Sequence, residues 1–362
     1  MVTDARTGEQ LALKRSIGIN PVPLIGLSLV VLLIVWLAIN LEKTPNQFLQ
    51  AFLIGITNGS VFALIALGYT LVYGILELIN FAHGDVFMLG GMIAITLIGS
   101  DVFGLHPGQA AYELWPKILA VLAITMVGCG LINAIVERIA YRPLRGAPRL
   151  VPLITAIAAS FILQNIALAS KGANYVTLNS GLSGAADFLP QGNIFTFGGG
   201  GRYTWASLIV LMITAPVLFA LLWLVQRTKQ GKAMRATAQD REAAAMMGIN
   251  VNRTISFTFL IAGGLAGAAG TIYALYFTSV RFDQGFQLGL IAFTAAVLGG
   301  IGNLPGAVLG AMLIGLVQTF NNTLAWHAPG SDWTQSIVFG VLIMILVFRP
   351  EGLLGERTPE GG

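Results

Sequence analysis

Charged residues are scarce in this chain of 362 amino acids. Only 20 Lys and Arg and 16 Asp and Glu are present, which is 10% of the residues, whereas a soluble domain carries about 25%. Cysteine is almost absent too: Cys129 stands alone, which excludes a disulfide scaffold. Hydrophobic residues make up 56% of the chain, and the mean hydropathy is +0.79. This composition excludes a cytosolic enzyme and a disordered tail, and it indicates a helical membrane protein.

The chain also lacks the motifs of common active sites. No G-x-x-x-x-G-K-[ST] phosphate-binding loop occurs, so ATP hydrolysis by that route is excluded. His83, His106 and His327 are scattered and no cysteine cluster accompanies them, so we expect no metal site. No Ser/His/Asp or paired-carboxylate arrangement stands out. We therefore expect no enzyme activity, no cofactor and no nucleic-acid partner for this chain.

Long stretches without any charge predict the membrane spans. A helix needs about 20 mostly apolar residues to cross the hydrocarbon core. The charge-free stretches are 16–41, 44–76, 86–100, 118–136, 151–170, 203–226, 254–280, 284–331 and 333–348. The stretch 284–331 would make a helix of about 72 Å, so it must fold back, and the Gly- and Pro-rich segment 299–306 marks the break. We predict an all-α, polytopic membrane protein with about 8–10 transmembrane helices, some of them broken.

The basic residues predict the orientation of these spans. If the N-terminus is cytoplasmic and the spans alternate, 15 of the 20 Lys and Arg residues fall on the cytoplasmic side. Both termini are then cytoplasmic. We divide the chain into a cytoplasmic tail with an extra, uncleaved anchor helix (1–46), a transmembrane domain (47–355) and a C-terminal tail (356–362). The segment 77–85 is either a turn between two spans or a re-entrant segment.

The cytoplasmic loop 227–253 is the most highly charged part of the chain and contains a short helical motif. Asp240 can cap the start of a helix, because its carboxylate accepts hydrogen bonds from free backbone N–H groups. The alanines that follow favour a helix, and Gly248 can end it in a left-handed conformation. Met246 and Met247 suit an irregular groove. The sequence leaves two interpretations open: an amphipathic helix on the lipid headgroups, or a docking element.

The motif Glu-Ala-Ala-x-x-x-Gly at 242–248 resembles the coupling-loop signature of ABC importer permeases, although residues 258–261 depart from its usual Ile-x-Leu-Pro continuation. Three further stretches extend the resemblance: NGSVFALIALGYTLVYGILELINFAHGDVFMLGGM at 58–92, ERIAYRPLRGAPR at 137–149 and FTAAVLGGIGNLPGAVLGA at 293–311. Together they resemble the LivH-type permeases of branched-chain amino acid ABC importers, whose superfamily also includes urea and amide permeases. The resemblance covers residues 47–355.

The resemblance implies a function and partners. It implies a permease subunit of the bacterial inner membrane that translocates leucine, isoleucine or valine and is driven by a separate ATPase. The implied partners are LivG/LivF-like ATPase subunits that bind the ATP, a second, LivM-like permease subunit and an extracytoplasmic solute-binding protein. Urea, short amides and other amino acids are alternative substrates. The residues implied in ATPase coupling are Asp240, Glu242, Ala243, Ala244, Met247 and Gly248.

Several polar or small residues are candidates for a translocation path or gate: Asn58, Tyr69, Asn80, His83, Gly84 and Asn303. For the segment 80–85 we favour a polar turn at the cytoplasmic interface with His83 in solvent, because the charge alternation places it there. A contact to the ATPase and a gate hinge at Gly84 are the alternatives. Asn58 either hydrogen-bonds between helices or faces the path.

The sequence leaves open which helix packs against Gly263 and Gly267, and it bears on whether transport is driven by ATP or by an ion gradient. Gly263 and Gly267, four residues apart, predict close helix packing, either within this chain or against a second permease subunit. An ion-coupled secondary transporter or a channel would need charged groups inside the spans. Almost every charge lies at the end of a predicted span, with Asp85 and Glu137 near the boundaries, so the sequence favours ATP-driven transport.

Overall fold

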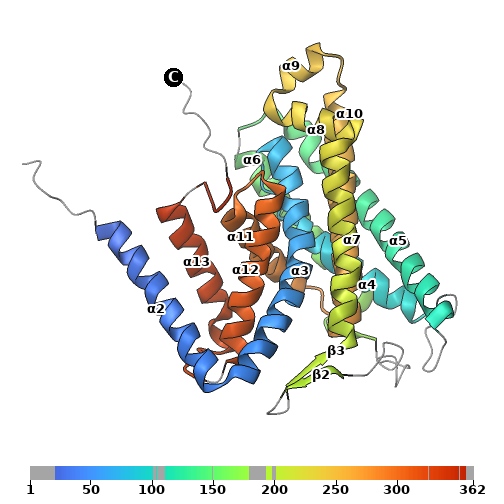
Figure 1. The fold of residues 1–362 in the computed structure, drawn as a ribbon. Coiled ribbons are helices and arrows are strands. Elements are labelled where there is room, and N and C mark those ends of the chain that lie inside the picture. The colour runs from blue at the N-terminus through green and yellow to red at the C-terminus, as the bar shows by residue number, and fades with distance from the viewer. Residues whose placement is uncertain are drawn as a thin grey trace, which may run out of the picture.

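Helices make up most of the structure. The computed structural model describes residues 21–100, 103, 111–148, 150–178, 193–197, 201–324, 326–349 and 351–355. Within these residues the chain forms a bundle of apolar helices (Figure 1). The short helix α9 (Arg241–Met246) lies at one end of the bundle, and the antiparallel hairpin of β2 (Asn193–Phe197) and β3 (Gly201–Thr204) lies at the opposite end.

Seven helices in the described part of the chain are long and apolar enough to cross a membrane. They are α3 (Pro45–Leu76), α5 (Ala111–Val136), α6 (Leu150–Lys171), α7 (Trp205–Arg227), α10 (Val251–Phe277), α12 (Leu304–Thr323) and α13 (Thr334–Phe348), the last joined to the 3-10 turn η4 (Ser331–Trp333). Two shorter apolar helices are α4 (Ala82–Ile98) and α11 (Gln284–Gly299), and the first helix of the described residues is α2 (Pro21–Lys43). The prediction of an all-α polytopic membrane protein is confirmed; against the 8–10 spans predicted, the described residues hold these seven long helices and the two shorter apolar ones.

The helices α3 and α10 form the centre of the bundle. Most of their residues are buried, whereas α6, α7 and α13 expose many apolar side chains. Helix α3 packs along α12, which is remote in sequence, and α10 packs along α4 and α5 (Figure 1). Since the outer helices expose mainly apolar side chains, their surface is suited to lipid contact.

Glycines let α10 approach α5 closely. Gly263 lies against the backbone carbonyl of Cys129, and Gly267 lies against that of Thr125. In the same contact the hydroxyls of Thr125 and Thr271 share a hydrogen bond of 2.6 Å. The predicted close packing at Gly263 and Gly267 is therefore a contact between two helices of this chain, as small residues allow in membrane bundles.

The shorter helices α4 and α11 begin inside the bundle. His83, in the first turn of α4, lies against Gly68, which precedes the end of α3 by eight residues, or about 12 Å along the helix axis. Gly84 lies against Gly285 in the first turn of α11. The segment 77–81 therefore re-enters the bundle. The location of this segment at the cytoplasmic interface stays a prediction, but a turn with His83 in solvent is wrong, because the first turn of α4 packs against α3.

The predicted break within the stretch 284–331 is present. After the end of α11, Gly300 and Gly302 adopt φ angles of 106° and 93°, which glycine reaches without a steric cost. The side chain of Asn303 then caps the start of α12. The segment 351–355 returns to this turn and hydrogen-bonds to the end of α11. The break is thus a capped turn between two helices.

Helix α2 is attached to the loop between α12 and α13. Trp36 Nε1 donates a hydrogen bond to the Trp326 carbonyl at 3.1 Å, and Asn40 Oδ1 accepts one from the Trp326 N–H at 3.2 Å. The start of α2 and the end of α13 lie on the side of the bundle that carries α9 (Figure 1). The cytoplasmic location of this side stays a prediction, and residues 1–20 and 356–362 lie outside the described part.

A methyl group at Gly263 should loosen the contact between α5 and α10. The Cβ of Gly263→Ala would collide with the Cys129 carbonyl, so we expect a lower melting temperature and a loss of about 1–3 kcal/mol of stability. Gly264→Ala is the matched control, because its Cβ would lie 3.5 Å from the nearest atom, the Met126 carbonyl oxygen. Thermal unfolding of both purified variants in detergent measures the difference. Equal melting temperatures would contradict the close approach at Gly263.

Candidate functional site

The loop 227–253 folds into two short helices, α8 (Lys229–Gln239) and α9 (Arg241–Met246). One carboxylate oxygen of Asp240 caps α9 by accepting hydrogen bonds from the backbone N–H groups of Glu242 at 2.8 Å and Ala243 at 3.0 Å. Gly248 follows the helix with a φ of 82°, the left-handed conformation that often ends helices. The capped helix predicted here is present; the sequence predicts a helix from Arg241 to Met247, and it ends at Met246.

Helix α9 has a packed side and a free apolar side. The exposed fractions of Met246 and Met247 are 82% and 84%, whereas that of Ala244 is 4%. Of the residues predicted for coupling, Asp240, Glu242, Met247 and Gly248 are exposed, Ala243 is half-buried and Ala244 is buried. Methionine side chains are flexible and polarizable, and they recur on surfaces that adapt to a partner. The two methionines therefore form a small apolar surface that is available for docking.

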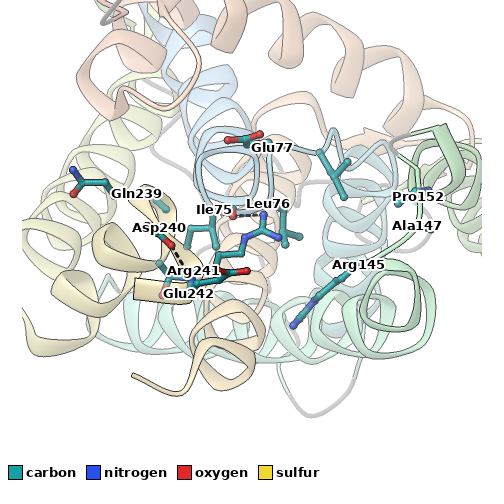
Figure 2. A pocket seen from close by; sticks show the side chains of 13 residues that line it. Ile75, Leu76, Glu77, Arg145, Ala147, Pro152, Gln239, Asp240, Arg241 and Glu242 are labelled. Carbon is teal, nitrogen blue, oxygen red and sulfur yellow. Dashed lines mark hydrogen bonds between the residues drawn. The ribbon is translucent and has the colours of Figure 1, made fainter. Parts of the chain in front are cut away.

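A polar cavity of about 480 Å³ lies beside α9 (Figure 2). It is lined by the end of α3, by the connection between α5 and α6, and by the junction of α8 and α9. Across it, Arg241 Nη2 donates a hydrogen bond of 2.8 Å to the carbonyl oxygen of Ile75 in the last turn of α3 (Figure 2). Carbonyls in the last turn of a helix have no partner within the helix, and a cation there is favourable. The first residue of α9 is thereby connected to the central helix.

His83 is buried, so the interpretation of a solvated imidazole is wrong. Its exposed fraction is 0%. The ring packs edge-on against Tyr69, with 4.8 Å between the ring centroids, and lies over Gly68, where a side chain would collide with the imidazole. The physical reason is that the glycine leaves a space on α3 that the imidazole fills. This space depends on which helices are neighbours, and the order of charges along the chain does not reveal it.

Gly84 and Asp85 lie where α4 crosses its neighbours. A Cβ on Gly84 would collide with the Gly285 carbonyl, so α4 and α11 meet backbone to backbone. Asp85 is buried next to this crossing, and its Oδ2 accepts a hydrogen bond from the Ser160 hydroxyl of α6. Gln164 Nε2 donates to the same hydroxyl at 3.3 Å. A carboxylate therefore lies inside the bundle, although the sequence analysis placed it near a span boundary.

Ser160 and Gln164 are polar neighbours of Asp85 that the sequence analysis missed. They are four residues apart in α6, so they share one face of a helix that is otherwise mainly apolar. A paired polar position within an apolar span is a signal for an inward-facing contact. Combined with Asp85, the lone acidic residue at the start of the earlier apolar stretch 86–100, it could have predicted this cluster.

The three candidate asparagines have different surroundings. Asn58 Nδ2 donates a hydrogen bond of 3.1 Å to the Thr319 hydroxyl of α12, so the interhelical role predicted for it is present. Asn80 accepts a hydrogen bond of 3.0 Å from the Tyr141 hydroxyl. Asn303 caps α12 at the α11–α12 turn. The candidates that the structure brings into one region are Tyr69, Asn80, His83 and Gly84.

Comparison with known proteins identifies the family. Residues 51–347 match the family described as branched-chain amino acid transport system / permease component. The chain is 38% identical over 321 residues to the high-affinity branched-chain amino acid transport system permease protein BraD of Pseudomonas aeruginosa. That alignment covers 87% of this chain and 98% of BraD.

Two relatives from Escherichia coli K12 extend the comparison. The high-affinity branched-chain amino acid transport system permease protein LivH is 34% identical over 314 residues, which are 86% of this chain and 97% of LivH. The ribose import permease protein RbsC is 27% identical over 322 residues, which are 87% of this chain and 90% of RbsC. The family match over residues 51–347 includes α9. The chain therefore belongs to the family of branched-chain amino acid transport system permease components and is a multi-pass protein of the bacterial inner membrane.

Proposed function

We propose that this chain is the permease subunit of an ABC importer that translocates leucine, isoleucine and valine, driven by a separate ATPase that docks on α9. The observation that carries the proposal is the exposed, capped helix α9 in a chain whose relatives BraD and LivH are permeases of high-affinity branched-chain amino acid transport systems. The sequence has no phosphate-binding loop of its own, so a partner would hydrolyse the ATP.

Docking of the ATPase would bury the apolar side of α9. Met246 and Met247 would enter a groove of the partner, with the exposed carboxylate of Glu242 at its edge. A movement of α9 would reach α3 directly, because Arg241 holds the Ile75 carbonyl. Helix α3 runs through the centre of the bundle and packs along α10 and α12. ATP-driven motion outside the membrane would thereby change helix packing within it.

The path candidates on α3 and α4 fit a closed gate. Tyr69 and His83 are buried, and Gly84 has no room for a methyl group beside Gly285. In the proposed cycle the crossing of α4 and α11 separates when the amino acid passes. Asn58 already has a partner in α12, and Asn303 has partners in α12 and in the segment 351–355, so we assign them a supporting role.

The other parts of the importer follow from the family resemblance. They are ATPase subunits that hold the ATP, a second permease subunit and an extracytoplasmic solute-binding protein that selects the amino acid. The chain itself would need no cofactor and would catalyse no reaction. Residues 47–355 would form its transmembrane domain, with loop 227–253 for the ATPase, and residues 1–46 would add a tail and an anchor helix.

Reconstitution of the complete importer tests the function. Proteoliposomes with ATP on the α9 side should accumulate radiolabelled leucine only when the ATPase and the solute-binding protein are both present. Competition by unlabelled urea, a short amide or ribose instead of isoleucine and valine would assign a different substrate. Accumulation of leucine by this chain alone from an ion gradient would contradict the proposal and favour a secondary transporter.

A charged side chain on the apolar side of α9 should weaken the binding of the ATPase. The side chain of Met247 is 84% exposed, so Met247→Glu should leave the fold intact. Docking would then bury an unpaired carboxylate at a cost of several kcal/mol, and leucine uptake should fall about tenfold or more. Uptake and the amount of co-purified ATPase measure the effect, with Met247→Leu as the apolar control. Normal uptake by Met247→Glu would remove the docking role of this residue.

Loss of the Asp240 cap should destabilise α9 alone. Asp240→Ala removes the two hydrogen bonds to Glu242 and Ala243, and a lost cap costs about 1 kcal/mol. The backbone amides of α9 should then exchange faster in hydrogen–deuterium exchange mass spectrometry of the purified protein. Asp240→Asn retains an acceptor and should exchange nearly as wild type does. Equal exchange of all three proteins over residues 241–247 would contradict capping by this side chain.

A further inference from the structure

A buried ion pair lies at the connection between α5 and α6. The side chain of Glu137 is fully buried, and that of Arg145 is 15% exposed. Glu137 begins the π-helical turn η1 (Glu137–Tyr141), and the 3-10 turn η2 (Arg142–Leu144) follows. Single π-helical turns are rare and often occur at functional sites. The position of this pair therefore suggests a role beyond packing.

The start of α10 completes the ion pair. Arg145 Nη2 donates a hydrogen bond to Glu137 Oε1, and its Nη1 donates to Asn252 Oδ1 at 2.5 Å. Ser256 Oγ donates to the other carboxylate oxygen of Glu137, Oε2, at 2.7 Å. Asn252 and Ser256 are four residues apart, so they lie on the same face of α10. Side chains of α10 thus hold both members of the pair.

The ion pair is also close to the docking helix. Only residues 247–250 separate the end of α9 from the start of α10, and Asn250 caps α10 by accepting a hydrogen bond of 3.0 Å from the Arg253 N–H. Arg145 lines the cavity beside α9, together with Arg241 (Figure 2). When α9 is displaced, either the linker 247–250 changes its conformation or the start of α10 moves as well.

The surroundings favour an ion pair that stays closed. Burial lowers the pKa of the Arg145 guanidinium, Glu137 opposes this shift, and the positive charges of Arg142 and Arg241 add to it. Separating the pair would leave an uncompensated buried charge on each side, which is costly. When the start of α10 moves, the connection between α5 and α6 is therefore expected to move with it.

We propose that Glu137 and Arg145 are positioning residues that transmit the movement of α9 and α10 to α5 and α6 during transport. The proposal rests on the proposed function and adds a second connection to that of Arg241 with α3. It assigns neither residue a contact with the amino acid or with ATP. The helices that respond directly to the ATPase would then be α3, α5, α6 and α10.

Variants of Arg145 in the complete importer test this role. Arg145→Gln removes the charge, and uptake of radiolabelled leucine by proteoliposomes should fall about tenfold while the ATPase rate stays within about twofold of wild type. The number of leucine molecules transported per ATP hydrolysed therefore falls. Arg145→Lys restores a positive charge without the forked geometry and should recover part of the loss.

Two further variants separate this role from a purely structural one. Arg142→Gln is the matched control, because Arg142 is an exposed arginine three residues earlier. It should transport as wild type does. Ser256→Ala removes one hydrogen bond to Glu137 without stranding a charge, and it should lower transport per ATP by a smaller factor. If Arg145→Gln folds poorly, the transport per ATP of Ser256→Ala tests whether the ion pair transmits the movement.

Three results would contradict either this proposal or the proposed function. Wild-type transport per ATP in well-folded Arg145→Gln, or in Ser256→Ala where Arg145→Gln folds poorly, would overturn the proposal. A proportional loss of uptake and ATPase activity with a lower melting temperature in Ser256→Ala would leave the pair a structural role only and would also overturn it. Absence of leucine uptake by the wild-type importer would instead contradict the proposed function, so the two failures are distinguishable.

Discussion

Every backbone N–H and C=O group inside a membrane must find a partner within the protein, and this requirement shapes the whole chain. Helices satisfy it along the spans. At the ends of helices, side chains supply the missing hydrogen bonds. Asn303 caps α12, and Arg241 donates to a carbonyl in the last turn of α3. The irregular segment 77–81 enters the bundle where Asn80 is bonded by Tyr141 and covered by neighbouring helices. Few charges are present because few could be satisfied in such surroundings.

Close backbone contacts between helices hold this bundle together. In a soluble protein the hydrophobic effect of water would drive the same helix packing. Lipid chains are as apolar as leucine, so helices in a membrane associate through shape and hydrogen bonds. Glycines at the contacts of α10 with α5 and of α4 with α11 let the backbones approach closely. Such contacts do not deform gradually, and helix shifts across them are discrete steps. In the proposed transport cycle, the crossing at Gly84 and Gly285 would be a gate with two arrangements.

The end of the bundle that carries α9 combines an exposed surface with buried anchors. Met246 and Met247 face outward, whereas Arg241 and the Glu137–Arg145 pair are bonded to α3 and α10. A force applied to α9 would be distributed over several helices instead of one loop. Mechanical coupling of this kind would need no titrating group, although the bundle does contain one in the buried carboxyl of Asp85.

The sequence alone determined that the protein is a helical membrane protein, that the chain breaks after α11 and that α9 is capped. These features depend on composition and on residues a few positions apart. It did not reveal that His83 is buried, that Ser160 binds Asp85 or that Ser256 binds Glu137. The last two contacts join residues 75 and 119 positions apart. Only the tertiary structure decided them, since a polar group in an apolar bundle is stabilised by whichever helix lies beside it, and local patterns do not specify that neighbour.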